Sequence, residues 1–334
     1  MLRQLARLTR PFPAAGPRAS ALAVYEVAGA LAPARETGEE GVACVDDAAR
    51  GLVLYCDLWA ATGQAGHRQR AASLLEFVLW MQSADGRFVN FVHDWTGRQN
   101  HDGPTSFAGG AFWQARGLRG LATAWVVLAD DRAGGAFARA LASVEQAEHV
   151  PPDVRAVHIA AVLGVLRSGR EQHLRHVLAR WCDELAANRL GDVILDGETD
   201  EVHLWGHSQE SVLVQAGMLL GRSDLVETAR RSAEAVFVPA IASCFNFPVV
   251  QPYGVACAVH AMDALAAATT DTRYVRLAGE ARAWFDGRNT AATAVYDRVA
   301  GRVADGIDDG RVSGNSGAES NIVAAEALFA QIAV

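Results

Sequence analysis

The 334-residue sequence contains no lysine, so all of its fixed positive charge comes from arginine. Its formal net charge at pH 7 is −8, whereas proteins that bind a nucleic-acid backbone concentrate Lys and Arg. It also has no apolar run of about 18 residues, the length that a membrane-spanning helix needs. We therefore expect neither nucleic acid nor a membrane as a partner.

Cysteine is scarce, and no two cysteines lie close enough in the sequence to form a C-x-x-C pair. The five are Cys44, Cys56, Cys182, Cys244 and Cys257. Their odd number and wide spacing argue against a disulfide scaffold and against a thiolate zinc site. We expect small buried apolar side chains, no bound metal, no cofactor, and a reducing cytoplasmic location.

Apolar residues instead recur with helical spacing in a composition that is 51% apolar and 20% charged. Val45, Ala48, Ala49, Leu52 and Cys56 show the i, i+3, i+4, i+7 pattern of an amphipathic helix. The pattern predicts about twelve helices, and neither β-type alternation nor a nucleotide-binding glycine motif is evident. The predicted helices span residues 18–34, 46–61, 67–82, 109–128, 133–147, 153–166, 171–187, 208–220, 224–237, 253–269, 272–285 and 317–332.

The segments between these helices alternate between short turns and long polar stretches. Twelve helices in such hairpins predict an all-α fold, an (α/α)6 toroid formed as a single domain by residues 18–334. The rival architecture is a superhelical solenoid, which should show a fixed sequence repeat. The Arg-rich, proline-interrupted residues 1–17 predict an N-terminal extension, because no targeting-type apolar core follows them.

Asp46 and Asp47 stand side by side at the start of the second predicted helix. Adjacent helical side chains point about 100° apart, so at most one of them can face a cavity squarely. Arg50 lies four residues after Asp46, a spacing that allows the two side chains to pair. The alternative is that both acids only complement the helix macrodipole. We expect the opposing carboxylate to come from Glu319 or from residues 200–210.

The long segment 83–108 mixes aromatic side chains with amides and charged groups. Such mixtures suit a carbohydrate site, where a few polar groups fix the ligand beside aromatic faces. An Ω-like loop whose aromatic residues plug the core is the alternative. The predicted substrate-binding residues of this segment are Arg87, Asn90, His93, Asp94, Trp95 and Asp102.

The segment 191–210 has the densest group of polar and aromatic residues, and it includes Glu198, Asp200, Glu201, His203, Trp205, His207 and Glu210. His203 and His207 are four residues apart, but a helix start at Gly206 and Ser208 would break the geometry of a helical metal pair. We expect His207 to transfer a proton or to bind substrate, and Trp205 and Glu210 to contact substrate.

Several short motifs resemble those of the six-hairpin glycosidase superfamily. They are Val45-Asp46-Asp47-Ala48-Ala49-Arg50-Gly51, Asp85-Gly86-Arg87-Phe88-Val89-Asn90-Phe91, Tyr296-Asp297, Asp305-Gly306 and Asn315-Ser316-Gly317-Ala318-Glu319-Ser320. They spread over roughly residues 40–330 and are similar to those of uncharacterised toroids sometimes fused to glycosyltransferases. The resemblance implies an (α/α)6 barrel with a carbohydrate-active role. It departs at Gly110-Ala111-Phe112-Trp113, where the comparable segment usually reads Gly-Arg-Ala-Leu-Trp.

The leading interpretation is a glycoside hydrolase that acts on a small oligosaccharide or glycoconjugate through paired carboxyl groups. Asp47, Glu319 and His207 are its predicted catalytic residues, and Asp46 and Tyr296 are further substrate-binding residues. Ser316 and Glu319 also match an S-x-x-E capping box, which is the structural alternative for Glu319. Two other functions remain open: a non-catalytic glycan-binding toroid that assists a glycosyltransferase, and a sugar epimerase or isomerase.

Overall fold

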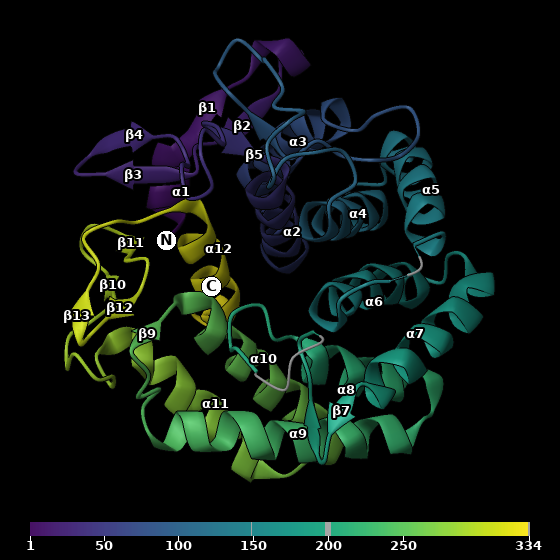
Figure 1. The fold of residues 1–334 in the computed structure, drawn as a ribbon, viewed down its shortest axis with the longest axis vertical. Helices are drawn as coiled ribbons and strands as arrows, with labels where there is room; N and C mark the ends of the chain where they lie inside the picture. The colour runs from purple at the N-terminus through teal and green to yellow at the C-terminus, as the bar shows by residue number, and fades with distance from the viewer. Residues whose placement is uncertain (148, 198–201, 333–334) are drawn as a thin grey trace. The chain divides into compact units, whose positions relative to one another are not determined.

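The computed structural model describes residues 1–147, 149–197 and 202–332, and this part of the chain contains thirteen α-helices (Figure 1). The helices are α1 (Leu2–Leu8), α2 (Val45–Thr62), α3 (Ala65–Trp80), α4 (Ala111–Val127), α5 (Asp131–Glu145), α6 (Pro152–Arg167), α7 (Arg175–Ala187), α8 (Gln209–Leu220), α9 (Ser223–Ala242), α10 (Pro252–Thr269), α11 (Thr272–Arg282), α12 (Ala318–Ala327) and α13 (Phe329–Ile332). The prediction of an all-α fold is confirmed.

The strands are two or three residues long and form small antiparallel sheets at the ends of the helices. They are β1 (Thr9–Pro11), β2 (Ser20–Leu22), β3 (Tyr25–Val27), β4 (Ala30–Ala32), β5 (Ala43–Cys44), β6 (Phe91–Val92), β7 (Arg189–Leu190), β8 (Val193–Ile194), β9 (Val249–Val250), β10 (Tyr296–Asp297), β11 (Arg302–Val303), β12 (Ile307–Asp308) and β13 (Arg311–Val312). β12 pairs with both β9 and β13, whereas the other sheets have two strands.

The chain divides into two compact units. Unit 1 comprises Met1–Val150, Gly314–Ala325 and Phe329–Val334, and unit 2 comprises Pro151–Ser313 and Glu326–Leu328. In the described part of both units, no helix is long and apolar enough to cross a membrane.

In unit 1, α2 packs against α3 and α4. Its predicted apolar stripe is buried, and Gly63 ends it with a φ of +66°, the left-handed conformation that glycine adopts without strain. The close approach of α4 depends on Gly120, where a Cβ atom would lie 3.2 Å from the Cβ of Ala49. The predicted helix 46–61 and its C-cap are confirmed.

The helix predicted over residues 18–34 is wrong. These residues form β2, β3 and β4, and β3 pairs with β4 in register Tyr25↔Ala32. The turn between them contains Ala28 and Gly29, with φ values of 49° and 83°. Two consecutive residues with positive φ are typical of the tight turn of a β-hairpin, so a local turn outweighs the apolar periodicity.

Residues 1–17, for which the sequence predicts an extension, lie within unit 1. α1 buries Leu5 and Leu8, and Phe12 stacks edge-on against Phe77 of α3 with ring centroids 5.0 Å apart. β1 pairs with β2. This segment therefore contributes to the core of unit 1.

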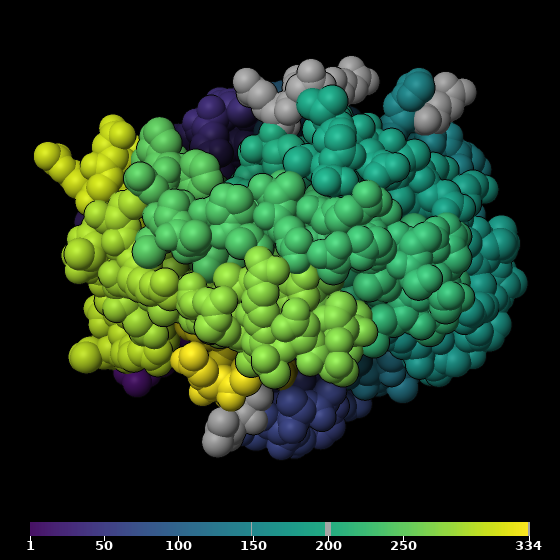
Figure 2. All heavy atoms as spheres, turned by 90° about the horizontal axis from the view of Figure 1, so that it is seen from below, coloured from purple at the N-terminus to yellow at the C-terminus, as the bar shows by residue number. Residues whose placement is uncertain are grey.

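In unit 2, α8 packs against α9, and α10 packs against α8, α9 and α11. Figure 2 shows one face of this unit, across which α9 (green) and α11 (yellow-green) run. Ion pairs lie on the surface of these helices. Arg230 binds Glu227 and Glu234 at 2.7 and 3.0 Å, and Arg273 of α11 binds Glu234 at 3.2 Å. The apolar residues of α10, in contrast to these charged residues, are buried.

Four of the five cysteines of the chain, Cys44, Cys56, Cys182 and Cys257, are also buried.

Candidate active site

The side chains of Asn90 and of Cys44, the last residue of β5, hold the start of α2. The backbone N–H of Asp46 donates to Asn90 Oδ1 at 3.2 Å, and that of Asp47 donates to Cys44 Sγ at 3.4 Å. Both satisfy N–H groups that a helix N-terminus leaves without a partner. Asn90 is buried, and its amide nitrogen donates to the Thr105 carbonyl at 3.0 Å. This residue, predicted to bind substrate, therefore orients the acidic turn of α2.

An acid–arginine cluster forms around that turn, and it comprises Asp46, Asp47, Arg50, Arg116 and Glu319. Arg50 binds Glu319 Oε2 at 2.6 Å and Asp47 Oδ1 at 3.1 Å, and Arg116 binds Asp46 Oδ2 at 3.0 Å. Of the two adjacent acids, Asp47 is the one whose side chain pairs with Arg50, whereas the Asp46 pairing that the spacing also allows is replaced by a hydrogen bond from Arg50 to the Asp46 carbonyl at 3.3 Å. The adjacent acids diverge on the helix, and the Asp46 side chain points to α4.

The three carboxyl groups of the cluster differ in their access to solvent. The side chain of Glu319 is 28% exposed, that of Asp46 is 17% exposed, and that of Asp47 is 4% exposed. The Oδ1 atom of Asp46 is buried and has no hydrogen-bond partner among the described residues. Such unsatisfied buried atoms are rare in folded proteins and frequently lie at functional sites.

Burial also sets the pKa of Asp47. It raises this pKa to about 6, and the negative charges of Glu319 and Asp46 act in the same direction against the opposing effect of Arg50. Asp47 therefore accepts a proton at mildly acidic pH, although it lies beside a guanidinium group. Perturbed carboxyl groups of this kind are common in catalytic sites.

Arg116 is the member of the cluster that sequence reasoning missed. The resemblance drew attention to a missing arginine at the start of α4, and Arg116 lies in the second turn of that helix. Its guanidinium carbon is 4.7 Å from the centroid of the Phe112 ring, a cation–π distance. A sequence signal was available, since Arg116 and Arg119 are the two charged residues of a helix made largely of apolar and small residues.

The other residues predicted in segment 83–108 lie elsewhere in unit 1, and among the described residues only Asn90 of that group hydrogen-bonds to the cluster. Arg87 is exposed beside Asp85, with an N–O distance of 3.7 Å. Hydrogen bonds from Thr96, followed by those from Arg98, lower the pKa of Asp94 to about 2. His93 and Trp95 are half-buried, and Asp102 is exposed.

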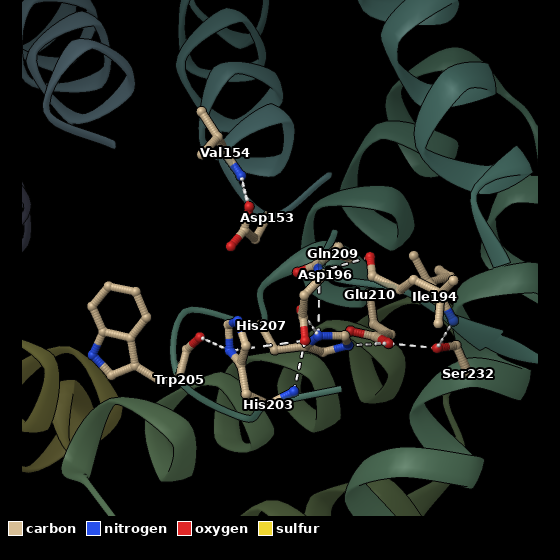
Figure 3. A network of polar contacts seen from close by, with 11 residues as sticks. Asp153, Val154, Ile194, Asp196, His203, Trp205, His207, Gln209, Glu210 and Ser232 are labelled. Atoms are coloured by element: carbon tan, nitrogen blue, oxygen red, sulfur yellow. Dashed lines mark hydrogen bonds and ion pairs between the residues drawn. The ribbon is translucent and has the colours of Figure 1, made fainter. Parts of the chain in front are cut away.

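A second polar network lies in unit 2 at the start of α8 (Figure 3). His207 bridges two carboxylates: its Nδ1 atom contacts Asp196 Oδ1, and its Nε2 atom lies 2.9 Å from Glu210 Oε1. Gln209 donates to Asp196 Oδ1 at 2.7 Å, and the Ser232 hydroxyl donates to Glu210 Oε1 at 2.5 Å. The structure thus brings His207 and Glu210 together, as their spacing of three residues allows.

The side chains of His207 and Glu210 have no exposed surface. Burial by itself lowers the pKa of His207, but the two flanking carboxylates outweigh this effect and raise it to about 10. The imidazole is therefore a buried cation at neutral pH. Its geometry suits the positioning of neighbouring residues better than proton exchange with a substrate.

Asp196 extends this network to the segment that carries His203 and Trp205. Its Oδ2 atom accepts a hydrogen bond from the His203 backbone N–H at 2.8 Å, and the His203 side chain contacts the Trp205 carbonyl at 2.8 Å. The Trp205 ring lies edge-on to Tyr253 with centroids 5.4 Å apart. His203 and Trp205 both line a cavity of about 550 Å³.

The other predicted residues are Tyr296 and three acids near residue 200. Tyr296 is half-buried on β10, with the Arg298 guanidinium 4.9 Å from its ring centroid. Glu198, Asp200 and Glu201 lie outside the described residues. Across the described ranges, no group of three or more His, Cys, Asp or Glu side chains is arranged to hold a metal ion.

The amino-acid sequence matches no protein-family model and no curated protein. The structure is similar to that of a cellobiose 2-epimerase from Bacillus thermoamylovorans B4167, with a TM-score of 0.76 and 11% identity over 99% of this chain and 96% of that chain. It is also similar to a sugar epimerase from a ruminal bacterium, with a TM-score of 0.74 and 11% identity over 99% of this chain and 96% of that chain. A family 76 glycoside hydrolase from a bovine Bacteroides thetaiotaomicron strain has a TM-score of 0.68 and 11% identity over 99% of this chain and 76% of that chain.

The chain has the (α/α)6 toroid fold. This likeness confirms the architecture predicted from the helical hairpins. At about 11% identity, this similarity concerns the fold alone. The chemistry of the site depends on the residues of this chain.

Proposed function

We propose that the protein is a carbohydrate-active enzyme that hydrolyses glycosidic bonds with carboxyl groups of the acid–arginine cluster. One observation carries this proposal: three carboxyl groups and two guanidinium groups from α2, α4 and α12 converge within unit 1. Glycoside hydrolysis needs two carboxyl groups at one bond, one to protonate the leaving oxygen and one to activate water or attack the anomeric carbon.

Glu319 is the proposed base or nucleophile. Its side chain is the most exposed of the three acids, and the Arg50 nitrogen at 2.6 Å favours its ionised form. Asp46 is the proposed acid, because it is the other partly exposed carboxyl group of the cluster.

Asp47 has a positioning role in this proposal. Its carboxyl group is buried under Arg50 and accepts from the Arg50 guanidinium and from the Cys44 thiol. It thereby fixes the guanidinium that holds Glu319. We also assign His207 and Glu210 a positioning role, since their side chains have no exposed surface.

The test is hydrolysis of a panel of aryl glycosides and oligosaccharides by the purified protein and by Glu319→Gln and Asp46→Asn. Each substitution removes the acid or base function while keeping the side-chain volume, so kcat/KM should fall by about 100-fold or more. Asp131→Asn is the matched control, because Asp131 is an exposed carboxylate on α5 of the same unit. Wild-type rates in both cluster variants would contradict the proposal.

Substrates with different leaving groups distinguish the proposed acid, Asp46, from the proposed base or nucleophile, Glu319. Asp46→Asn should retain more activity on aryl glycosides with acidic phenols, which leave without protonation, than on oligosaccharides. Glu319→Gln should lose both activities equally. The opposite pattern would exchange the two assignments.

A sugar epimerase or isomerase is the second candidate. Its support is that the similar epimerases and isomerase have TM-scores of 0.72 to 0.76, against 0.56 to 0.68 for the glycosidases. Such an enzyme would need an accessible base, and His203, with a side chain 56% exposed at the cavity of unit 2, is the candidate. NMR of cellobiose or mannose after incubation distinguishes the candidates, since new reducing-sugar signals without cleavage would favour epimerisation. Saturable sugar binding without turnover would instead favour the glycan-binding alternative.

A further inference from the structure

A cavity in unit 2 is not explained by the proposed hydrolysis. It lies between the β7–β8 hairpin, residues 202–205, α9 and β9, and its volume is about 550 Å³. Small-molecule sites typically have volumes of about 300 to 1,000 Å³. The cavity therefore has the size of a site for a small organic molecule.

The lining of this cavity is mainly apolar. Nine of its thirteen described lining residues are Leu, Val or Phe, and Leu190, Phe247 and Val249 remain 56%, 43% and 59% exposed. Exposed apolar side chains that gather at one concave site mark a ligand site, since a bound apolar group would remove their surface from water. The side chains of His203 and Gln251 add polar groups at the same cavity.

Hydrogen bonds within the chain hold the walls of the cavity in place. The backbone N–H of Ile194 on β8 donates to the buried Ser232 hydroxyl of α9 at 3.0 Å. Asp196 holds the backbone of His203, as described above. A preformed site of this kind does not spend binding energy on ordering its walls.

A free sugar does not match this lining. Each buried hydroxyl group of a sugar must replace its hydrogen bonds to water, and among the described lining residues only His203, Trp205 and Gln251 carry polar side-chain groups. We propose that the cavity binds the alkyl or aryl group of an amphiphilic small molecule, with the polar end of that molecule at His203 and Gln251. This cavity shares no described lining residue with the acid–arginine cluster, and its test does not depend on catalysis.

The probe is 1-anilinonaphthalene-8-sulfonate, an aryl amphiphile whose fluorescence rises in apolar surroundings. The full chain should bind it saturably, and octanol and octyl glucoside (below its micelle concentration) should both displace it. Glucose and cellobiose should not displace it. Displacement by the glycoside but not by octanol would restrict the ligand to glycoconjugates, whereas displacement by the free sugars alone would overturn the proposal.

Two substitutions of different kinds test the location. Val236→Phe fills the cavity with apolar volume, and Phe247→Asp places a charge in its lining; each should weaken binding of the probe by about tenfold or more. Val275→Asp is the control, because Val275 is 61% exposed on α11 and does not line the cavity. Circular dichroism checks that each variant folds. Unchanged affinity in a folded Val236→Phe or Phe247→Asp protein would overturn the assignment. If either variant fails to fold, the displacement series on the unmodified chain still tests the proposal.

Discussion

Arg50 on α2 and Glu319 on α12 form an ion pair with an N–O distance of 2.6 Å, although 269 positions separate them in the sequence. The same guanidinium binds Asp47 at 3.1 Å. One buried arginine therefore joins the first turns of two helices and pairs with two carboxyl groups. The stability of unit 1 and the proposed chemistry both depend on this contact.

Removal of Arg50 should destabilise the fold strongly. In Arg50→Met, Asp47 would remain buried without its cationic partner, and breaking a buried pair in this way costs about 3–5 kcal/mol of unfolding free energy. The matched control is Arg98→Met, because the Arg98 side chain is 68% exposed in its pair with Asp94. An exposed pair contributes about 0–1 kcal/mol. Urea unfolding measures both, and equal small effects would contradict a buried, coupled cluster.

Asp47 should make stability depend on pH in the direction opposite to that of most carboxylates. Its pKa rises from 3.8 to about 6 on folding, so the folded state binds more protons between these two values. Its contribution is therefore greatest at low pH and is lost as pH rises from about 4 to 6, by up to about 3 kcal/mol. The difference in unfolding free energy between the wild type and Asp47→Asn should fall over this range. A difference that grows with pH would show that Arg50 outweighs burial.

His207 should act in the same direction at higher pH. Its folded pKa of about 10 lies above the ordinary value of 6.5, so its stabilising effect is complete below pH 6.5. The effect is lost as pH rises toward 10, and its size is on the order of a few kcal/mol. The wild type should lose more thermal stability between pH 7 and 9.5 than His207→Gln does. His173→Gln is the control, because the His173 side chain is 66% exposed, and it should follow the wild-type curve.

Gly86 in the turn after α3 should tolerate no side chain. Its φ is +88°, and a Cβ atom there would overlap with the backbone carbonyl of Arg139 on α5. Gly63 offers a matched comparison, since its φ is +66° but no atom lies within 4 Å of a Cβ at that position. Gly63→Ala carries only the left-handed strain of about 1–2 kcal/mol, whereas Gly86→Ala should cost at least about 2 kcal/mol more. Equal losses in chemical unfolding would mean that α5 can move away.

The local pattern of apolar residues was sufficient to predict the long helices. The stripe in residues 45–56 and the apolar run of α10 predicted α2 and α10 to within a few residues, because apolar periodicity reflects burial directly. The pattern failed at residues 18–34. There Ala, Val and Leu suit either a helix or a short strand, and the Ala28-Gly29 turn and the pairing with neighbouring strands decided between them.

The sequence by itself determined the all-α class, the hairpin arrangement of the helices and the presence of acids at helix starts, since these depend on spacing along one segment. Only the tertiary structure decided which charges meet. Arg50 binds Asp47 and Glu319 instead of the side chain of Asp46, and His207 lies buried between Asp196 and Glu210 instead of at a surface. The physical reason is that ion pairing and burial act through space, and the partners come from segments whose separation in the sequence carries no information about their distance.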